Sequence, residues 1–216
     1  MKNNSMKIGG VVDGDFTFQH QRKNEKFYQG YVVSTRKSGT TDRINIVVSE
    51  NVIGSELLKD GTSVEITGEF RSMNEYSDED KKSHLRLYMF AKEVRIGDAD
   101  IKFNNVKLRG YICKPTQYRL TPFGREVCDL LIAVHREYGR SDYIPCLTWG
   151  RNAKFAGNLS VGTEIEVEGR AQSRVYQRMI ENNGCEYPVS MTAYELSVSD
   201  ISVVKEDTED DESKWY

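Results

Sequence analysis

The sequence has few of the residues that build metal centres and disulfide frameworks. It contains four cysteines and three histidines in 216 residues. The cysteines show no C-x-x-C spacing, and the histidines have no partner at a ligand-like distance in the sequence. We therefore expect no metal, no cofactor and no disulfide framework. Cys113, Cys128 and Cys146 fall inside predicted strands, and together with Cys185 we interpret them as reduced thiols of a cytoplasmic protein.

Long apolar runs and enzyme motifs are also missing. No apolar stretch approaches the roughly twenty residues that span a bilayer, and residues 1–10 lack the apolar core of a secretory signal. The sequence has neither a G-x-x-x-x-G-K-[ST] phosphate loop nor a G-x-S-x-G nucleophile elbow. We therefore expect a protein that is not an enzyme and does not contact a membrane.

Acidic charge is concentrated at the C-terminus. The formal net charge is −3, yet residues 101–204 carry 13 basic and 11 acidic side chains. Residues 205–216 carry 2 basic and 6 acidic side chains, and no apolar residue precedes Trp215 in this segment. A composition of this kind cannot form a core, so we expect a disordered acidic tail over 205–216.

Residues 105–174 show the strongest structural pattern. Short apolar runs are broken by turn signals at Thr121–Gly124 and Tyr138–Ser141, and they predict strands. Residues 150–159 have helical spacing, and Gly162 ends the helical pattern. Strands, a short helix and a closing hairpin in this order predict a five-stranded Greek-key barrel, whose open face suits oligonucleotides.

The first half of the chain repeats parts of this pattern. Gly30-Tyr31-Val32 aligns with Gly110-Tyr111-Ile112 at an offset of 80, and residues 61–68 align with 162–169 at an offset of 101. We interpret the chain as two barrels in tandem, with the first copy shortened by about twenty residues in its middle. In this copy we predict a helix over 52–58.

These patterns divide the chain into five segments. Residues 1–21 are an N-terminal extension that either adds an edge strand or lies loose. In the first barrel, the closing hairpin is expected to have a polar loop at 74–83, and the corresponding loop of the second barrel is expected at 180–184. The expected segments are an extension (1–21), a first, shortened barrel (22–97), a linker (98–103), a second barrel (104–204) and the tail (205–216).

The motifs of residues 104–204 resemble the bacterial-type single-stranded DNA-binding protein (SSB) family, and residues 24–97 resemble a degenerate second copy. The motifs that carry the resemblance, in order, are Asn105-x-Val-x-Leu-x-Gly110, Arg119-x-Thr121-Pro122-x-Gly124, Leu130-x-Ile132-Ala133-Val134, Cys146-Leu147-x-Trp149-Gly150, Ala153-x-x-Ala156 and Gly162-Thr163-x-Ile165-x-Val167-x-Gly169-Arg170-x-Gln172-x-Arg174.

The resemblance implies an all-β fold of tandem OB-fold barrels, each five-stranded and Greek-key with a short helix, followed by the disordered tail. It also implies a non-catalytic protein of the bacterial cytoplasm or nucleoid that coats single-stranded DNA in replication, recombination or repair. Family members usually assemble four barrels, so a chain with two barrels is expected to form a homodimer.

Binding single strands without sequence preference requires cations along the phosphates and flat rings for the unstacked bases. The resemblance places stacking rings at Tyr138, Tyr143, Trp149 and Tyr176, three of which are usually tryptophan in the family. Strand alternation puts Tyr143 and Trp149 on one face, which is either the binding face or the core. The cations expected to contact phosphate are Arg119, Arg136, Arg151, Lys154, Arg174 and Arg178.

The tail resembles the family's partner-docking C-terminus in its acid-then-aromatic order, although the usual terminal Pro-Phe is missing. Its expected docking residues for replication or repair proteins are Asp210, Asp211, Glu212, Trp215 and Tyr216. Two alternatives stay open. The barrels could be a protein-interaction module of a replisome or mobile-element complex, or they could bind single-stranded RNA, because rings and cations do not distinguish the sugar.

Overall fold

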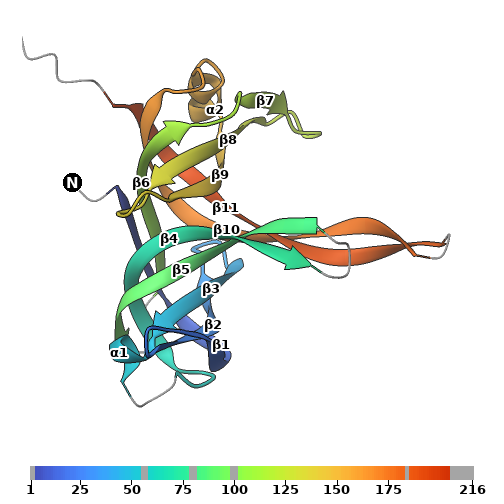
Figure 1. Ribbon diagram of the computed structural model, residues 1–216. Helices are drawn as coiled ribbons and strands as arrows, with labels where there is room; N and C mark the ends of the chain where they lie inside the picture. Colours follow the sequence, from blue (N-terminus) through green and yellow to red (C-terminus); the bar gives the residue numbers. More distant parts are fainter. Residues whose placement is uncertain (1–2, 55–57, 78–81, 98–101, 183–184, 205–216) are drawn as a thin grey trace, which may run out of the picture.

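A computed structural model describes residues 3–54, 58–77, 82–97, 102–182 and 185–204. In Figure 1, two β-barrels lie one above the other, with the N-terminal barrel below. The elements are β1 (Asn4–Arg22), β2 (Glu25–Thr35), β3 (Thr41–Ser49), α1 (Glu50–Ile53), β4 (Ser63–Ser77), β5 (Lys82–Ile96), β6 (Phe103–Ile112), β7 (Gln117–Leu120), β8 (Glu126–His135), β9 (Ser141–Trp149), α2 (Arg151–Ala156), β10 (Glu164–Asn182) and β11 (Cys185–Val203).

The two barrels close in the same way. In the first barrel, β1 pairs antiparallel with β2 and β4, and the parallel pair β3–β5 completes the ring. In the second barrel, β6 pairs antiparallel with β8 and β10, and the parallel pair β9–β11 completes it. The short helices α1 and α2 follow β3 and β9. The expected all-β fold of tandem five-stranded OB-fold barrels, each with a short helix, is confirmed.

Alternating side chains along the strands build the interior. In β8, Cys128, Leu130, Ile132 and Val134 are buried, while the residues between them are partly exposed. Burying an aliphatic side chain of this size contributes about 1.5–3 kcal/mol. One cluster of buried apolar side chains runs through both barrels, so their interiors are continuous.

The N-terminal segment forms a central strand of the first barrel. Strand β1 pairs with β2, with β4 and with β6 of the second barrel. Within it, Gly10 lies so close to β2 that an added Cβ would be 2.2 Å from the carbonyl oxygen of Val33. The expectation that residues 1–21 form an extension is therefore wrong, and the first barrel begins with β1.

The duplication is also more regular than the sequence motifs indicated. Gly110 in β6 corresponds to Gly10 in β1. An added Cβ at Gly110 would lie 2.4 Å from the carbonyl oxygen of Ala133, which is the same close approach as at Gly10. The barrels are thus aligned at an offset of 100 up to the helix and 101 after it. The alignment of Gly30 with Gly110 is wrong, and β1 supplies the twenty residues that the first copy was thought to lack.

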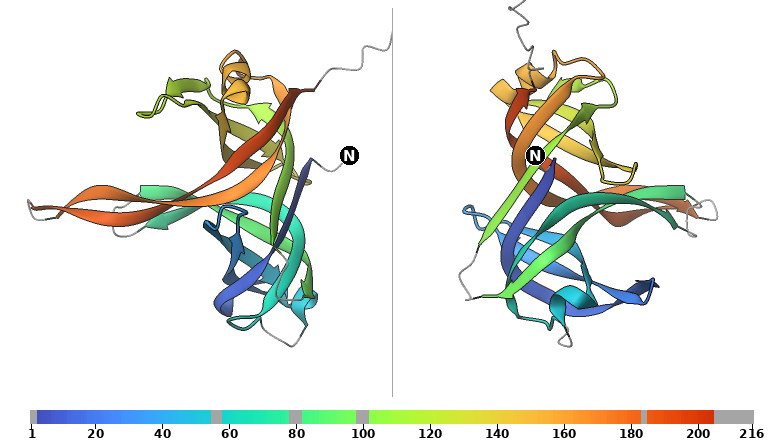
Figure 2. Two further views of the ribbon diagram at one scale, coloured as in Figure 1. Left: turned by 180° about the vertical axis from the view of Figure 1, so that it is seen from behind. Right: turned by 60° about the vertical axis from the view of Figure 1, so that its left-hand side comes forward.

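The barrels join where β1 and β6 pair antiparallel. The Asn4 side chain donates to the carbonyl of Phe70 (2.7 Å) and accepts from its amide (2.9 Å). Asn104 makes the same two hydrogen bonds with Ala171, at 2.7 and 3.0 Å. The two barrels are therefore related by an approximate twofold axis. The hairpins β4–β5 and β10–β11 project to the same side as two neighbouring arms (Figures 1 and 2).

Several element boundaries differ from the predictions. The helix of the first barrel spans Glu50–Ile53 and begins two residues before the predicted start at 52, because the hydroxyl of Ser49 accepts from the amide of Asn51 (3.1 Å). Gly54, with a φ of 67°, ends it. Residues 55–57 of the predicted helix lie outside the described residues. Residues 74–77, 82–83 and 180–182, which were predicted as loop, are strand, and the rest of these predicted loops (78–81 and 183–184) lies outside the described residues. Strand β7, which pairs with β8, was not predicted.

Part of the expected linker, residues 98–101, and the whole tail, residues 205–216, lie outside the described residues. Cys128 and Cys146 are buried free thiols, and Cys113 is a partly exposed one. Burial raises the pKa of all three. The side chain of Cys185 lies outside the described part. Among the described residues, no helix has the length and apolar character to cross a membrane.

Candidate nucleic-acid interface

Strand β9 presents two of the four expected rings on the outside of the second barrel. Ile144 and Cys146 point inward and are buried, whereas Tyr143 and Trp149 are 47% and 41% exposed. The two rings therefore lie on the outer face rather than in the core. Five residues of extended strand lie between them, so their Cα atoms are about 20 Å apart, a distance that several nucleotides of a single strand can span.

Tyr138 occupies the turn between β8 and β9. Its side chain is 98% exposed, and its φ of 82° is followed by a φ of 79° at Gly139. The turn is closed by a 2.7 Å hydrogen bond from the amide of Arg136 to the carbonyl of Arg140. A ring held in this way is fully open to a stacking partner.

Tyr176 lies apart from the other rings, on the β10–β11 arm. Its side chain is 37% exposed, and the guanidinium of Arg174 lies 5.8 Å from the centre of its ring. Arginine and aromatic ring thus occupy the same part of the arm. The side chain of Arg178, two residues further along, lies outside the described part.

The remaining expected cations differ in how the protein holds them. Arg119 forms an exposed ion pair with Asp129 (2.9 Å), and Lys154 forms one with Glu126 (3.0 Å). The hydrogen bond with Glu126 raises the pKa of Lys154. Arg151, at the start of α2, is exposed and has no ion pair or side-chain hydrogen bond within the described residues.

Arg136 does not lie free beside the rings. Its guanidinium pairs with the fully buried carboxylate of Asp142 and donates to the carbonyl of Ser72 in the first barrel (2.9 Å). The hydrogen bond with Asp142 raises the pKa of Arg136. The same carboxylate accepts from the amide of Ser72, and the hydroxyl of Ser72 accepts from the amide of Tyr143 (2.8 Å). Arg136 therefore holds the two barrels together, in place of the expected phosphate contact.

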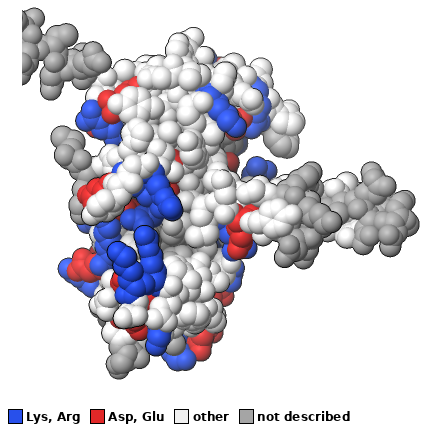
Figure 3. All heavy atoms as spheres, in the orientation of Figure 1, with Lys and Arg blue, Asp and Glu red and all other residues white. Residues whose placement is uncertain are grey.

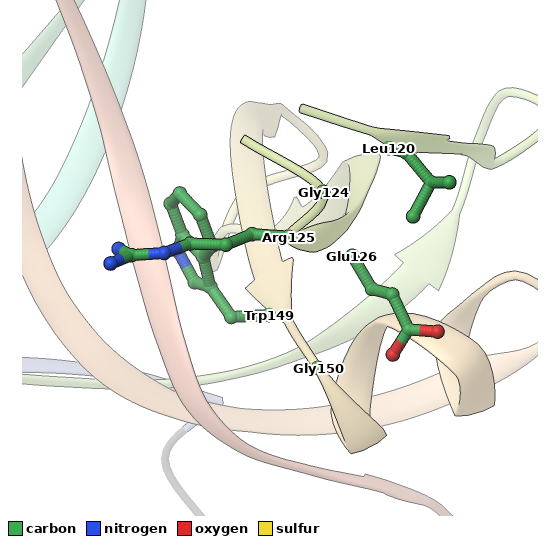
Figure 4. Close-up of a pocket in the computed structure, with 6 residues that line it drawn as sticks. All are labelled: Leu120, Gly124, Arg125, Glu126, Trp149 and Gly150. Carbon is green, nitrogen blue, oxygen red and sulfur yellow. The ribbon is translucent and has the colours of Figure 1, made fainter. Parts of the chain in front are cut away.

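A hollow of about 620 Å³ lies where β7, the turn before β8 and the end of β9 meet. Trp149 and Arg125 stand on one side of it, and Leu120 and Glu126 stand on the other (Figure 4). The sequence patterns indicated Trp149 but not Leu120. Leu120 follows no periodic apolar run, so only the pairing of β7 with β8 brings it near the tryptophan.

The first barrel lacks rings at the equivalent positions. The offsets of 100 and 101 place Ser38, Arg43, Ser49 and Glu75 where the second barrel has Tyr138, Tyr143, Trp149 and Tyr176. Arg43 lies 3.4 Å from the centre of the Tyr31 ring and also pairs with Asp13. The ring of Tyr31 is thus covered by Arg43 of the same barrel.

Basic side chains gather on one face over β4 and β5, as Figure 3 shows. Arg71 and Lys92 lie on these two strands, and both pair with Glu69. These two cations share one carboxylate, so only part of this positive charge is neutralised within the first barrel.

Comparisons with known proteins match the second barrel. The model of the single-strand binding protein family matches residues 103–204. Single-stranded DNA-binding protein A of Bacillus subtilis is 36% identical over 81 residues, which are 34% of this chain and 47% of that protein. Single-stranded DNA-binding protein 1 of Staphylococcus aureus is 37% identical over 81 residues, 34% of this chain and 48% of that protein. The chain thus spans about half the length of these curated relatives.

The structural comparison covers both barrels. The wild-type single-stranded DNA binding protein from Thermus aquaticus superposes with a TM-score of 0.74 at 16% sequence identity, over 94% of this chain and 93% of that one. At this identity the likeness establishes the shared two-barrel fold. Residues 103–204 therefore match the single-strand binding protein family, and both barrels share their fold with the Thermus aquaticus protein.

Proposed function

We propose that this protein is a non-catalytic single-stranded DNA-binding protein that coats exposed strands in replication, recombination or repair. The observation that carries the proposal is the placement of Tyr138, Tyr143 and Trp149, which are all exposed on one strand and its turn. They lie in the half of the chain that matches the family model.

The chemistry of this face supports the proposal. Each exposed ring can stack on an unpaired base, which contributes about 1–3 kcal/mol and tolerates any sequence. Arg151 and Arg125 lie near Trp149, and Arg174 lies near Tyr176. Guanidinium groups pair with phosphate through two hydrogen bonds and also lie flat on bases. The face therefore offers both groups that a flexible single strand needs.

The first barrel is proposed to serve assembly. Its equivalent positions carry Ser38, Arg43, Ser49 and Glu75, none of which stacks as an aromatic ring does. Its arm lies beside the arm of the second barrel (Figure 2). We propose that two chains form a homodimer of four barrels, and that the tail residues 205–216 dock replication or repair proteins.

Titration with oligo-dT tests the proposal. The chain has two tryptophans, so Trp215→Phe isolates the emission of Trp149, which base stacking is expected to quench. Trp149→Ala combined with Tyr176→Ala is expected to lower the affinity at least about twentyfold, because two stacking contacts are lost. Phe18→Ala, which removes a 56% exposed ring from the first barrel, is the matched control.

Two results would contradict the proposal. Unchanged Trp149 emission and unchanged affinity in the double variant would show that this face does not hold the strand. A parallel titration with oligo-rU separates DNA from RNA preference. Binding of neither nucleic acid would favour the protein-interaction alternative, in which the outer face holds a peptide.

A further inference from the structure

The hollow beside Trp149 is shaped by two glycines and two apolar side chains. Trp149 and Leu120, on opposite sides, are 41% and 61% exposed (Figure 4). Gly124 and Gly150 have φ values of 72° and 55°, and a Cβ at either would have nothing within 4 Å. Because these positions carry no side chain, the space beside the indole stays open. A planar ring could therefore enter between Trp149 and Leu120.

Glu126 brings a hydrogen-bond acceptor to this hollow. Its Oε1 accepts from the hydroxyl of Tyr118 (3.0 Å) and pairs with the ammonium of Lys154 (3.0 Å). Its Oε2 has no hydrogen-bond partner among the described residues, and the side chain is 26% exposed. A carboxylate has about four lone-pair sites, so an incoming donor can still be bound. The ion pair with Lys154 offsets the negative charge of Glu126.

We infer that this hollow takes one nucleobase of the bound strand, and that Glu126 makes it select a base with an exocyclic amino group, cytosine above thymine. The inference rests on the proposed function and adds a base preference to it. Cytosine presents an exocyclic amino group, and its N–H on the side away from the ring nitrogen can donate to a carboxylate. In thymine and uracil the one ring N–H lies between two carbonyl oxygens, and both repel the carboxylate.

The test compares homopolymers of dC, dU and dT of equal length with the full chain, at one salt concentration, by fluorescence anisotropy. Homopolymers offer the same base in every register, and dU separates the methyl group of thymine from its carbonyl. We expect dC to bind at least about fivefold more tightly than dU and dT. This ratio is the lower end of the discrimination between bases that one good side-chain contact provides.

Two variants isolate the carboxylate. Glu126→Gln keeps the shape of the side chain and is expected to bring the dC to dU ratio close to one. Glu166→Gln makes the same charge change on the exposed outer side of β10 and is expected to leave the ratio unchanged. Both variants raise the net charge equally, so a general electrostatic effect on affinity cancels in the ratio.

The outcomes separate this inference from the proposed function. Tight binding of all three homopolymers with equal affinities, or a preference for dC that survives in Glu126→Gln, overturns the inference and leaves the proposed function standing. Failure to bind any homopolymer overturns the proposed function itself.

Discussion

At the scale of single residues, the cations near the rings differ in whether a carboxylate of the same protein pairs with them. Arg151 is exposed and has no ionic partner in the described residues, whereas Arg119 is paired with Asp129. A paired guanidinium must exchange its carboxylate for a phosphate when DNA binds. Its contribution to affinity is therefore smaller than its charge alone indicates.

Asp129→Asn is expected to raise the affinity for single-stranded DNA. The change frees Arg119 to contact phosphate, and one additional contact steepens the salt dependence of log K by about 0.7. Affinities measured over a series of salt concentrations give this slope. Asp200→Asn, on an exposed position of β11, makes the same charge change elsewhere and controls for net charge. An equal rise in both variants would contradict a specific role of Asp129.

At the scale of the strands, close backbone approach fixes the closure of each barrel. Gly110→Ala would place a Cβ 2.4 Å from the carbonyl oxygen of Ala133. Relieving this clash requires a backbone shift, so we expect the free energy of unfolding to fall by about 1–3 kcal/mol. Denaturant titration measures the change. Gly39→Ala is the comparison variant, because the space around Gly39 is empty and the cost there comes from the φ of 85°, about 1–2 kcal/mol. An unchanged free energy of unfolding in Gly110→Ala would contradict the packing argument.

The hairpin turns of both barrels are fastened by matching contacts. Asp142 pairs with Arg136 and accepts from the amide of Ser72, while Asp42 pairs with Arg36 and accepts from the amide of Ser173 (3.1 Å). Both carboxylates are buried. Each turn is thereby attached to the arm of the other barrel, but only the turn next to Asp142 carries a ring at its tip, Tyr138.

Asp142→Asn and Asp42→Asn are expected to have similar costs in stability and different costs in binding. Neutralising one partner of a buried ion pair costs about 3 kcal/mol or more, and thermal melts should show this for both. Asp142→Asn should in addition lower the affinity for single-stranded DNA about fivefold or more, because Tyr138 and Tyr143 lose their support. Equal affinities for the two variants would assign the Asp142 contacts to stability alone.

The positions of the strands could be predicted from the sequence better than the pairing between strands and the contacts between the barrels. The alternation in β8 and the turn at Gly139 were sufficient to place the second barrel, because both are local signals. Strand β1 was missed because Gly9 and Gly10 interrupt its apolar pattern, and the need for a glycine at position 10 follows only from its close approach to Val33 in β2. Arg136 was misassigned because Ser72, its partner, lies 64 residues away in the sequence.

At the scale of the whole molecule, the fold is approximately twofold symmetric, but the outer surface is not. The barrels share an offset of 100 to 101 residues, a β1–β6 junction and matching Asp–Arg pairs. The four rings proposed to stack on bases, however, belong to the second barrel, and Arg43, at the position equivalent to Tyr143, covers Tyr31 instead. Duplication has preserved the contacts that hold the barrels together, whereas the residues proposed to stack on bases are present in one copy.

This asymmetry predicts that each chain binds one short oligonucleotide rather than two. An OB-fold occupies about 4–16 nucleotides, so an oligo-dT of about ten nucleotides can occupy one barrel at a time. Titration at protein concentrations well above Kd should saturate at one oligonucleotide per chain.

Exchanging Arg43 for Tyr would remove the guanidinium that lies over Tyr31 and supply a ring at the position of Tyr143. If this exchange adds a second, weaker binding event, the first barrel has kept the shape of the site and lost its rings. Saturation at two per chain in the unaltered protein would show instead that the first barrel binds through other residues.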